Sequence, residues 1–228
     1  MIMKKWNQLP KAMQTPEVKE YYDILKRKGL SLFFKRIFDI VVSGVLIIIL
    51  SPVMLVLAIL IKLDSAGPVM FRQRRVTAFN KVFRIFKFRT MVVNAESKGT
   101  QVTTNNDPRV TRIGKLIRGC RLDELPQLFN VFLGDMTFVG TRPEVEKYVA
   151  AYTPEMMATL LLPAGITSEA SIKYKDEERL LEAAEDTDEV YINTVLPEKM
   201  KYNLEAIKNF SFFSDIKIMF QTVFAVLK

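Results

Sequence analysis

Histidine is absent from this chain, and cysteine occurs once, at Cys120. Without histidine, the chain has no imidazole base for a serine or cysteine nucleophile, no His-ligated zinc site and no histidine proton shuttle. A single cysteine excludes an intramolecular disulfide and favours a reducing compartment. Any catalysis therefore has to rest on carboxylates, lysine, arginine, tyrosine or a hard metal ion.

The residues that are present describe a basic protein with enough apolar side chains for a core. The 228 residues fit one domain, or a domain with an appendage, and 49% of them are hydrophobic. The formal net charge is +8, with the excess concentrated in the first half. Such a charge suggests an anionic partner: a membrane surface, a nucleic acid or a phosphorylated ligand.

Residues 40–61 form a run of 22 residues without a charge. As a straight helix the run would be about 33 Å long, against a hydrocarbon core of about 30 Å, so it predicts a membrane segment. Ser51 and Pro52 lie in its middle. Pro52 lacks the N–H that would bond to Ile48, so we expect a kink here, with the Ser51 hydroxyl taking up a freed backbone carbonyl.

Charge on both sides of the run bears on its path through the membrane. Residues 1–36 carry nine lysines and arginines against three acids, and residues 62–89 carry eight against Asp64 alone. Because basic flanks prefer the cytoplasmic side, a segment that enters and returns satisfies both flanks, whereas one crossing does not. From the residues alone, a kinked spanning helix and a re-entrant helix both stay open.

A basic hairpin is expected next. After Gly67-Pro68 the sequence reads as two strands around a turn at residues 77–81. Between Arg72 and Arg89 it carries seven lysines and arginines and four phenylalanines. This mixture suits a nucleic-acid surface with stacking rings, but its place after a membrane segment favours contact with lipid phosphates or an anionic ligand.

The second half of the chain is predicted to be mainly helical. Caps and closing glycines predict helices over residues 107–119 (with Asp107 as N-cap), 123–132 and 144–152. Residues 94–106 are expected to form a polar loop, and residues 176–190 are acidic and helix-prone. The apolar spacing of residues 204–228 fits either core packing or an interfacial helix.

Asp123 and Glu124 are the carboxylates around which a chemical site is expected. Neighbours on a helix point about 100° apart, so each needs a separate role. At the N-terminus of a helix the dipole attracts anions and lowers the pKa of Asp123, which keeps it ionised. Arg118 and Arg121, just before it, would neutralise phosphate oxygens.

These residues together predict an ionised Asp123 that attacks phosphorus, arginines that neutralise charge, and a carboxylate left for Mg²⁺. The competing interpretation is that Asp123 and Glu124 only complement the helix dipole. For an Asp-Glu pair taken alone, this second interpretation is the simpler one.

Three ordered stretches place the pair in a wider context: KRIFDIVVSGVLIIILSPVMLVLAILIKLDSAGPVMFRQRR, FRIFKFRTM and DPRVTRIGKLIRGCRLDELPQLFNVFLGDMTFVGTRP. Together they resemble the bacterial sugar transferases called monotopic phosphoglycosyl transferases. The resemblance runs from about Lys35 to Pro143, resumes at Gly165-Ile166-Thr167 and returns in FFSDIKIMFQTV.

The resemblance implies a fold and a domain arrangement. It implies an α+β fold, mainly helical with a small β-hairpin, in a monotopic membrane protein with amphipathic interfacial helices. The family's Ser-Pro break, which makes the membrane helix re-entrant, matches Ser51 and Pro52. We therefore expect a basic interfacial segment over residues 1–34, a re-entrant membrane helix over 35–63 and a cytoplasmic, membrane-associated catalytic domain over 64–228.

The resemblance also implies a reaction. Such enzymes move a sugar 1-phosphate from a UDP-sugar to polyprenol (undecaprenyl) phosphate and release UMP, the first membrane step in building a surface polysaccharide or glycan. They act at the cytoplasmic face of the bacterial inner membrane. The family's dyad falls on Asp123, which forms a covalent phosphosugar intermediate, and Glu124, with Mg²⁺ bound near both. The family's arginine five residues before the nucleophile matches Arg118, and its Arg-Pro turn matches Arg142-Pro143.

The sequence departs from the family pattern after Leu162. Many members carry an Asn-Gly-Arg element where this chain reads PAGITSEASIKYKDEE. Lys175 stands roughly at the place of that arginine, and lysine does not reproduce a bidentate guanidinium clamp. Lys173 and Lys175 are nevertheless candidate substrate-binding residues, with Arg179 as another substitute. The transferred sugar stays open.

The expected partners are a UDP-sugar, polyprenol phosphate and membrane lipids, with no nucleic acid; whether the chain forms a homodimer stays open. Two other functions remain as alternatives. One is a membrane-anchored phosphotransferase that uses metal-bound water and forms no covalent enzyme. The other is a non-enzymatic, basic protein that binds lipid or nucleic acid, which predicts salt-sensitive affinity without turnover.

Overall fold

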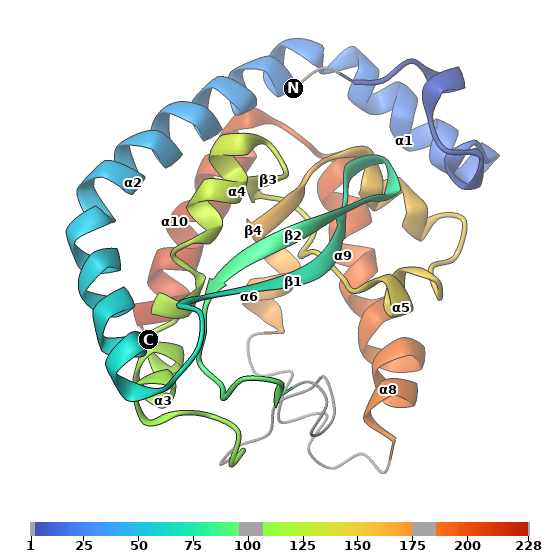
Figure 1. Cartoon of the computed structure of the whole chain (residues 1–228). Helices are drawn as coiled ribbons and strands as arrows, with labels where there is room; N and C mark the ends of the chain where they lie inside the picture. Colours follow the sequence, from blue (N-terminus) through green and yellow to red (C-terminus); the bar gives the residue numbers. More distant parts are fainter. Residues whose placement is uncertain (1–2, 96–106, 175–185, 228) are drawn as a thin grey trace.

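A computed structural model of the chain describes residues 3–95, 107–174 and 186–227. The molecule is mainly helical, with two separate two-stranded sheets among the helices (Figure 1). This confirms the expected mainly helical α+β fold with a small hairpin, and it adds a sheet that was not expected. Lys175, Arg179 and most of the loop over 94–106 and the acidic stretch over 176–190 lie outside the described residues.

Helix α2, Gly29–Asp64, is the long apolar helix, and it begins six residues before the expected position 35. Its most apolar 18-residue stretch has a mean hydropathy of 3.1, and 17% of that stretch is buried. Figure 1 shows α2 curving along one side of the molecule. Length, composition and exposure together set α2 apart from a buried core helix and indicate membrane association.

The structure continues α2 through Pro52 without interruption. Pro52 has no N–H to give to the Ile48 carbonyl, and the Ser51 hydroxyl donates to that carbonyl over 2.8 Å. The Ser51 side chain thus replaces the backbone donor that proline removes. The re-entrant path through a bilayer stays a prediction.

Polar side chains near the start of α2 fix it to the rest of the molecule. Lys35 is buried and donates to Asp215 Oδ2 over 2.6 Å and to the Val139 carbonyl over 2.8 Å. Asp39, also buried, accepts from the Thr137 hydroxyl over 2.7 Å. An apolar helix is therefore held to the body by buried polar contacts at one end, while the apolar side chains further along it are largely exposed.

The expected hairpin is confirmed. Strands β1, Met70–Thr77, and β2, Lys81–Phe88, are antiparallel, with Met70 opposite Phe88 and Thr77 opposite Lys81. Helix α4, Gln127–Leu133, packs on β2 through the fully buried Asn130, which donates to the Arg84 carbonyl and accepts from the Phe86 N–H. These bonds place the residues just before α4 beside the hairpin.

The helices predicted over 107–119 and 123–132 begin later than expected. Helix α3, Arg112–Gly119, ends at the expected glycine but begins at an N-cap formed by Thr111, because the Asp107 carboxylate binds Arg109 instead. The helix expected over 123–132 is divided into a 3₁₀ turn, Leu122–Glu124, and α4. Pro126 cannot donate the backbone hydrogen bond that one continuous helix needs here.

The second sheet positions the Arg142-Pro143 turn. Strands β3, Met136–Val139, and β4, Ala164–Thr167, are parallel. Gly140 and Gly165 let the two backbones approach, since a Cβ on Gly165 would lie 2.2 Å from the Gly140 nitrogen. The helix expected over 144–152 shortens to α5, Glu146–Val149, because the N-cap residue Val145 is extended and the Glu144 carbonyl before it accepts from the Val76 N–H.

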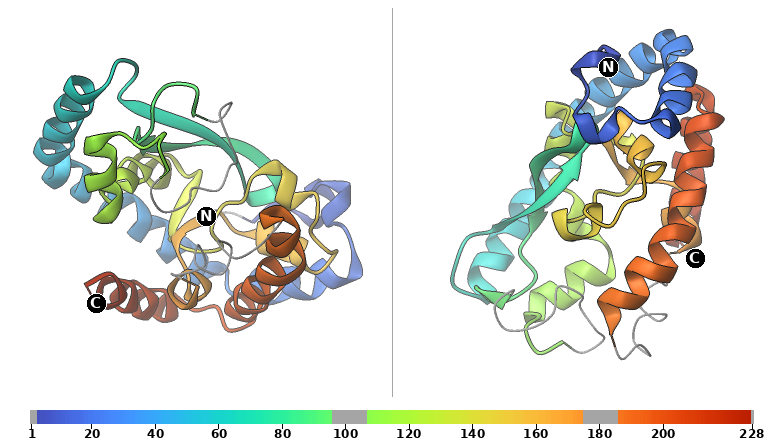
Figure 2. Two further views of the ribbon diagram at one scale, coloured as in Figure 1. Left: turned by 90° about the horizontal axis from the view of Figure 1, so that it is seen from below. Right: turned by 90° about the vertical axis from the view of Figure 1, so that its right-hand side faces the viewer.

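The remaining helices complete the core around these elements. Helix α1, Pro16–Arg27, buries Val18, Tyr21 and Leu25 in one hydrophobic cluster with residues of α9, and the N-terminal segment lies across one end of the hairpin (Figure 2). The other helices are α6, Glu169–Lys173, α8, Thr187–Val190, α9, Leu196–Lys208, and α10, Phe212–Leu227, with a π-helical turn over Tyr191–Val195 between α8 and α9.

Candidate active site

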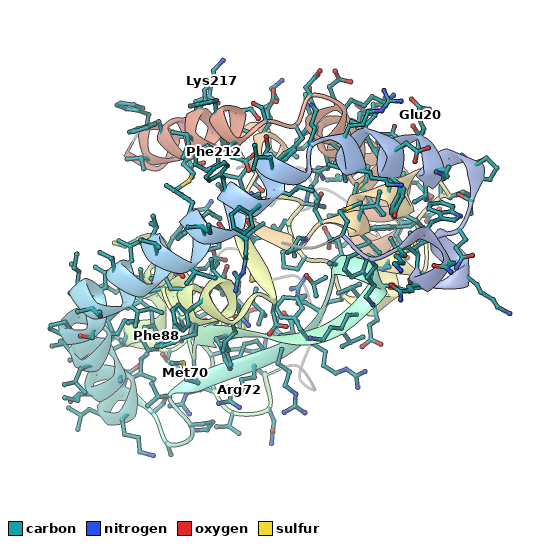
Figure 3. All side chains as sticks on the ribbon, turned by 90° about the horizontal axis from the view of Figure 1, so that it is seen from above. Glu20, Met70, Arg72, Phe88, Phe212 and Lys217 are labelled. Carbon is teal, nitrogen blue, oxygen red and sulfur yellow. The ribbon has the colours of Figure 1, made fainter. Side chains whose placement is uncertain are left out.

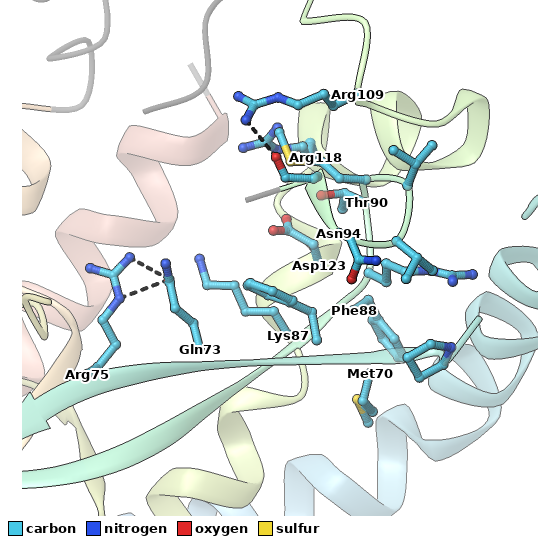
Figure 4. Close-up of a pocket in the computed structure, with 17 residues that line it drawn as sticks. Met70, Gln73, Arg75, Lys87, Phe88, Thr90, Asn94, Arg109, Arg118 and Asp123 are labelled. Atoms are coloured by element: carbon cyan, nitrogen blue, oxygen red, sulfur yellow. Dashed lines mark hydrogen bonds between the residues drawn. The ribbon is translucent and has the colours of Figure 1, made fainter. Parts of the chain in front are cut away.

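Asp123 lies in a cavity of about 360 Å³ between the hairpin and the end of α3 (Figure 4). Basic and polar side chains share this cavity with it: Gln73 and Arg75 from β1, Lys87 from β2, and Arg109 and Arg118 from the segment around α3. We call it the basic cavity. Arg118 is therefore near Asp123, as predicted.

Glu124 faces a different space from Asp123. Its Oε1 accepts from Lys87 Nζ over 2.8 Å and from Arg142 Nη2 over 3.0 Å, and all three side chains are at least partly buried. Among the described residues, no hydrogen bond involves its second oxygen, Oε2. Glu124, Arg121 and Arg142 line a second, mostly apolar cavity. The two carboxylates thus have separate surroundings, as their adjacency predicted.

The expected lowering of the Asp123 pKa is wrong. Burial raises the pKa of Asp123, the neighbouring Glu124 raises it further, and Lys87 and Arg118 only partly oppose this. The residue lies in a single 3₁₀ turn rather than at the N-terminus of a longer helix. For Glu124, burial acts to raise the pKa, but Arg142 and Lys87 outweigh it and hold the pKa well below the usual range.

Arg118 and Arg121 lie on opposite sides of the dyad. Arg118 lines the basic cavity, whereas Arg121 lines the apolar one. Arg121 adopts a left-handed conformation (φ 54°) just before the 3₁₀ turn, where the chain changes direction, and its side chain is exposed. Arg118 is thus placed in the same cavity as Asp123, whereas Arg121 is placed in the cavity that Glu124 lines; their role in neutralising phosphate oxygens stays a prediction.

Three further residues that line the basic cavity were not predicted from the sequence: Arg75, Gln73 and Lys87. Arg75 donates to Gln73 Oε1 through Nε and Nη2 and to the carbonyl of the buried Pro143 through Nη1, over 3.1 Å. Among the described residues, no carboxylate forms an ion pair with Arg75. Burial lowers the pKa of Arg75. Because strand residues alternate in direction, Gln73 and Arg75 lie on one face of β1. The predicted strand therefore already implied that these two side chains share a face.

Lys173 is not brought to the dyad. It forms an ion pair with Glu169 over 3.1 Å and lies over the Tyr202 ring at 4.1 Å, so its charge is engaged on α6 and α9. Lys173 lines neither the basic cavity nor the apolar cavity beside Glu124. Lys175 falls outside the described residues.

The donor set for a metal ion is small. Within the described residues, no group of three or more acidic, cysteine or histidine side chains is arranged to hold one. Asp123 offers carboxylate oxygens in the basic cavity, and Glu124, the next residue, has a second carboxylate oxygen beyond the one that accepts from Lys87 and Arg142. Mg²⁺ is commonly bound by one or two carboxylates together with substrate phosphates and water. The pair therefore fits a metal ion that binds with a phosphorylated ligand rather than alone.

Comparison with known proteins identifies a matching family model and several relatives. Residues 30–228 match the family model described as bacterial sugar transferase. The chain is 41% identical over 198 residues to the UDP-N-acetylgalactosamine-undecaprenyl-phosphate N-acetylgalactosaminephosphotransferase of Aeromonas hydrophila. The match covers 86% of this chain and 44% of that protein.

Two other relatives are named as UDP-glucose:undecaprenyl-phosphate glucose-1-phosphate transferases. The Klebsiella pneumoniae protein is 38% identical, and the match covers 86% of this chain and 40% of that protein. The Caulobacter vibrioides protein is 34% identical, and the match covers 85% of this chain and 69% of that protein. The chain thus spans less than half the length of the first two relatives. Since the family model covers most of the chain, this protein belongs to the bacterial sugar transferase family.

Proposed function

We propose that this protein transfers a sugar 1-phosphate from a UDP-sugar to polyprenol (undecaprenyl) phosphate and releases UMP. The observation that carries the proposal is the position of Asp123, a carboxylate in a cavity lined by lysine and arginine side chains. The names of the relatives support this reaction class. They differ in the sugar, so the sugar is not part of the proposal. The expected setting is the cytoplasmic face of the bacterial inner membrane, at the start of surface polysaccharide assembly.

In the first step, an Asp123 carboxylate oxygen attacks the phosphorus nearest the sugar. A bond forms between that oxygen and phosphorus, the bond from phosphorus to the bridging oxygen breaks, and UMP leaves with the electron pair. Lys87, Arg75 and Arg118 line the same cavity, and they would neutralise the diphosphate oxygens that otherwise repel a carboxylate. The product is a phosphosugar ester of Asp123.

In the second step, an oxygen of the polyprenol phosphate attacks the same phosphorus. The bond from phosphorus to Asp123 breaks, and the electron pair returns to the carboxylate, so Asp123 is regenerated without another reactant. Glu124, held by Lys87 and Arg142, keeps two cations beside the reacting phosphorus. Mg²⁺ held by Asp123 and Glu124 with the substrate phosphates would supply further neutralisation of charge.

Release of UMP from a panel of UDP-sugars tests the proposal. Membranes that contain the protein should release UMP from at least one UDP-sugar when polyprenol phosphate is added, and form a polyprenyl diphosphate sugar. UMP release without any covalent enzyme would favour a phosphotransferase that uses metal-bound water. Lipid or nucleic-acid binding without UMP release, unaffected by loss of Asp123 and Glu124, would favour a binding protein.

The acid side of the pH profile should respond to Arg118. A nucleophilic carboxylate must be ionised, so activity falls as the pH drops through its pKa. Arg118 lowers the pKa of Asp123, so Arg118→Gln removes that effect and the fall in UMP release should begin at higher pH. Arg112→Gln, an exposed arginine on α3 that does not line the cavity, is the control. If UMP release falls at the same acidic pH in the wild type, Arg118→Gln and Arg112→Gln, this result would contradict the assignment of Asp123 as the ionised nucleophile.

We further propose that α2 is re-entrant, so that residues before and after it share the cytoplasmic side. In a Cys120→Ser background, Leu30→Cys, at the start of α2, and Arg72→Cys, beyond its end, place thiols at exposed positions. Both should be protected from a membrane-impermeant reagent in intact cells and react after permeabilisation. Reaction of one position alone in intact cells would show that α2 spans the membrane.

A further inference from the structure

The apolar cavity beside Glu124 lies between α2, α4 and α10. Its volume is about 490 Å³, within the range of small-molecule sites. Apolar side chains from five elements form most of its wall: Leu46 and Leu50 from α2, Leu128 from α4, Phe138 from β3, Ile166 from β4 and Ala225 from α10. We call this space the lipid groove.

One end of the lipid groove is charged. Arg121, Glu124 and Arg142 line it there. Lys87 and Arg142 already balance the charge of Glu124 through the ion pairs at 2.8 and 3.0 Å. Among the ion pairs of the described residues, none involves Arg121. The charged end therefore carries a net positive charge, which suits a phosphate. The remaining wall is mainly apolar and suits an apolar chain, although Thr167, Ser171 and Thr222 also line it.

The groove also lies next to the proposed membrane surface. Helices α2 and α10 are joined at one end, where Lys35 binds Asp215 and the rings of Phe38 and Phe212 meet at 5.6 Å (Figure 3). Further along both helices, Leu46, Leu50 and Ala225 line the groove. Their neighbours on the outer faces are large, apolar and exposed: Val45, Ile49, Val223 and Phe224. An apolar chain could thus pass from the bilayer into the groove between apolar side chains.

We infer that the lipid groove binds the acceptor, with its prenyl chain between α2 and α10 and its phosphate between Arg121 and Arg142. The UDP-sugar then occupies the basic cavity, so the two substrates reach the dyad from opposite sides. The inference rests on the proposed function and assigns the acceptor a place within it. It also gives Arg121 and Arg118 different ligands, which explains why they lie apart.

Filling the groove should separate the two half-reactions. Ala225→Phe places a ring inside the groove, whereas Val223→Phe places the same ring on the exposed face of α10 as a matched control. With a UDP-sugar that the wild-type protein accepts, and without acceptor, both variants should release about one equivalent of UMP per protein, as in the two-step scheme. With polyprenol phosphate, Ala225→Phe should raise the acceptor KM about tenfold or more, equivalent to about 1.4 kcal/mol of lost binding.

Leu46→Trp fills the groove from α2 and should act in the same way if Ala225→Phe does not fold. An unchanged acceptor KM in a folded groove-filling variant would overturn the inference. An equal rise in Val223→Phe would also overturn it, because the effect would then come from the outer surface. If the wild-type protein released no UMP from any UDP-sugar, with or without acceptor, the proposed function itself would fail, and this result is distinguishable from the other two.

Discussion

Asp123→Asn is expected to reduce UMP release by about a thousandfold or more, because the side-chain amide cannot form the phosphosugar ester. The substitution keeps the size of the side chain and removes only its charge and nucleophilic oxygen. In the structure Asp123 lines the basic cavity with Lys87 and Arg118, whereas Glu124 is engaged by two cations and faces the other cavity. Glu124 is therefore a poor substitute for the missing nucleophile.

Two measurements make the Asp123→Asn result specific. The first equivalent of UMP, measured without acceptor, should disappear along with steady-state turnover. Asp23→Asn, which changes a partly exposed carboxylate of α1 paired with Lys19, serves as the control and should keep wild-type activity. Turnover within a few fold of the wild type in a folded Asp123→Asn protein would exclude Asp123 as the nucleophile.

Glu124→Gln is expected to affect both stability and activity. The amide oxygen can still accept hydrogen bonds, but Lys87 and Arg142 lose the charge that balances them in a partly buried site. Removing one partner of a buried ion pair typically costs about 3–5 kcal/mol, so the melting temperature should fall. Loss of the fixed charges around the phosphorus should lower UMP release by about a hundredfold.

A double variant distinguishes the two effects of Glu124. In Glu124→Gln with Lys87→Met, one of the unbalanced cations is gone, so part of the stability should return while activity stays low.

The stabilisation by Glu124 depends on pH with a defined sign. The pKa of Glu124 is lowered in the folded state, so its stabilisation is present above the usual 4.5 of glutamate and is lost as the pH falls towards the folded-state value. Equal melting temperatures in wild type and Glu124→Gln at neutral pH would contradict this account.

Local sequence signals predicted much of the fold. The hairpin followed from two strand-like runs around a turn, and Gly134, with φ 94°, ends α4 as expected. The length of the uncharged run predicted α2. These features depend on neighbouring residues, which the sequence displays directly.

What was missed depends on contacts between distant residues. The β3–β4 pair has four residues in each strand, and its close backbone approach at Gly140 and Gly165 joins residues far apart in the sequence. The pKa of Asp123 was given the wrong direction because burial, which the sequence does not display, dominates it. Lys87 became a site residue only once the hairpin was placed against the dyad.

Mass spectrometry of the protein after incubation with a UDP-sugar alone would detect the proposed covalent phosphosugar on Asp123. We expect a mass increase of one sugar phosphate, located on the peptide that contains Asp123, with one equivalent of UMP in solution. Adding polyprenol phosphate should remove the adduct. Continued UMP release with no adduct, or an adduct on a residue other than Asp123, would contradict the account.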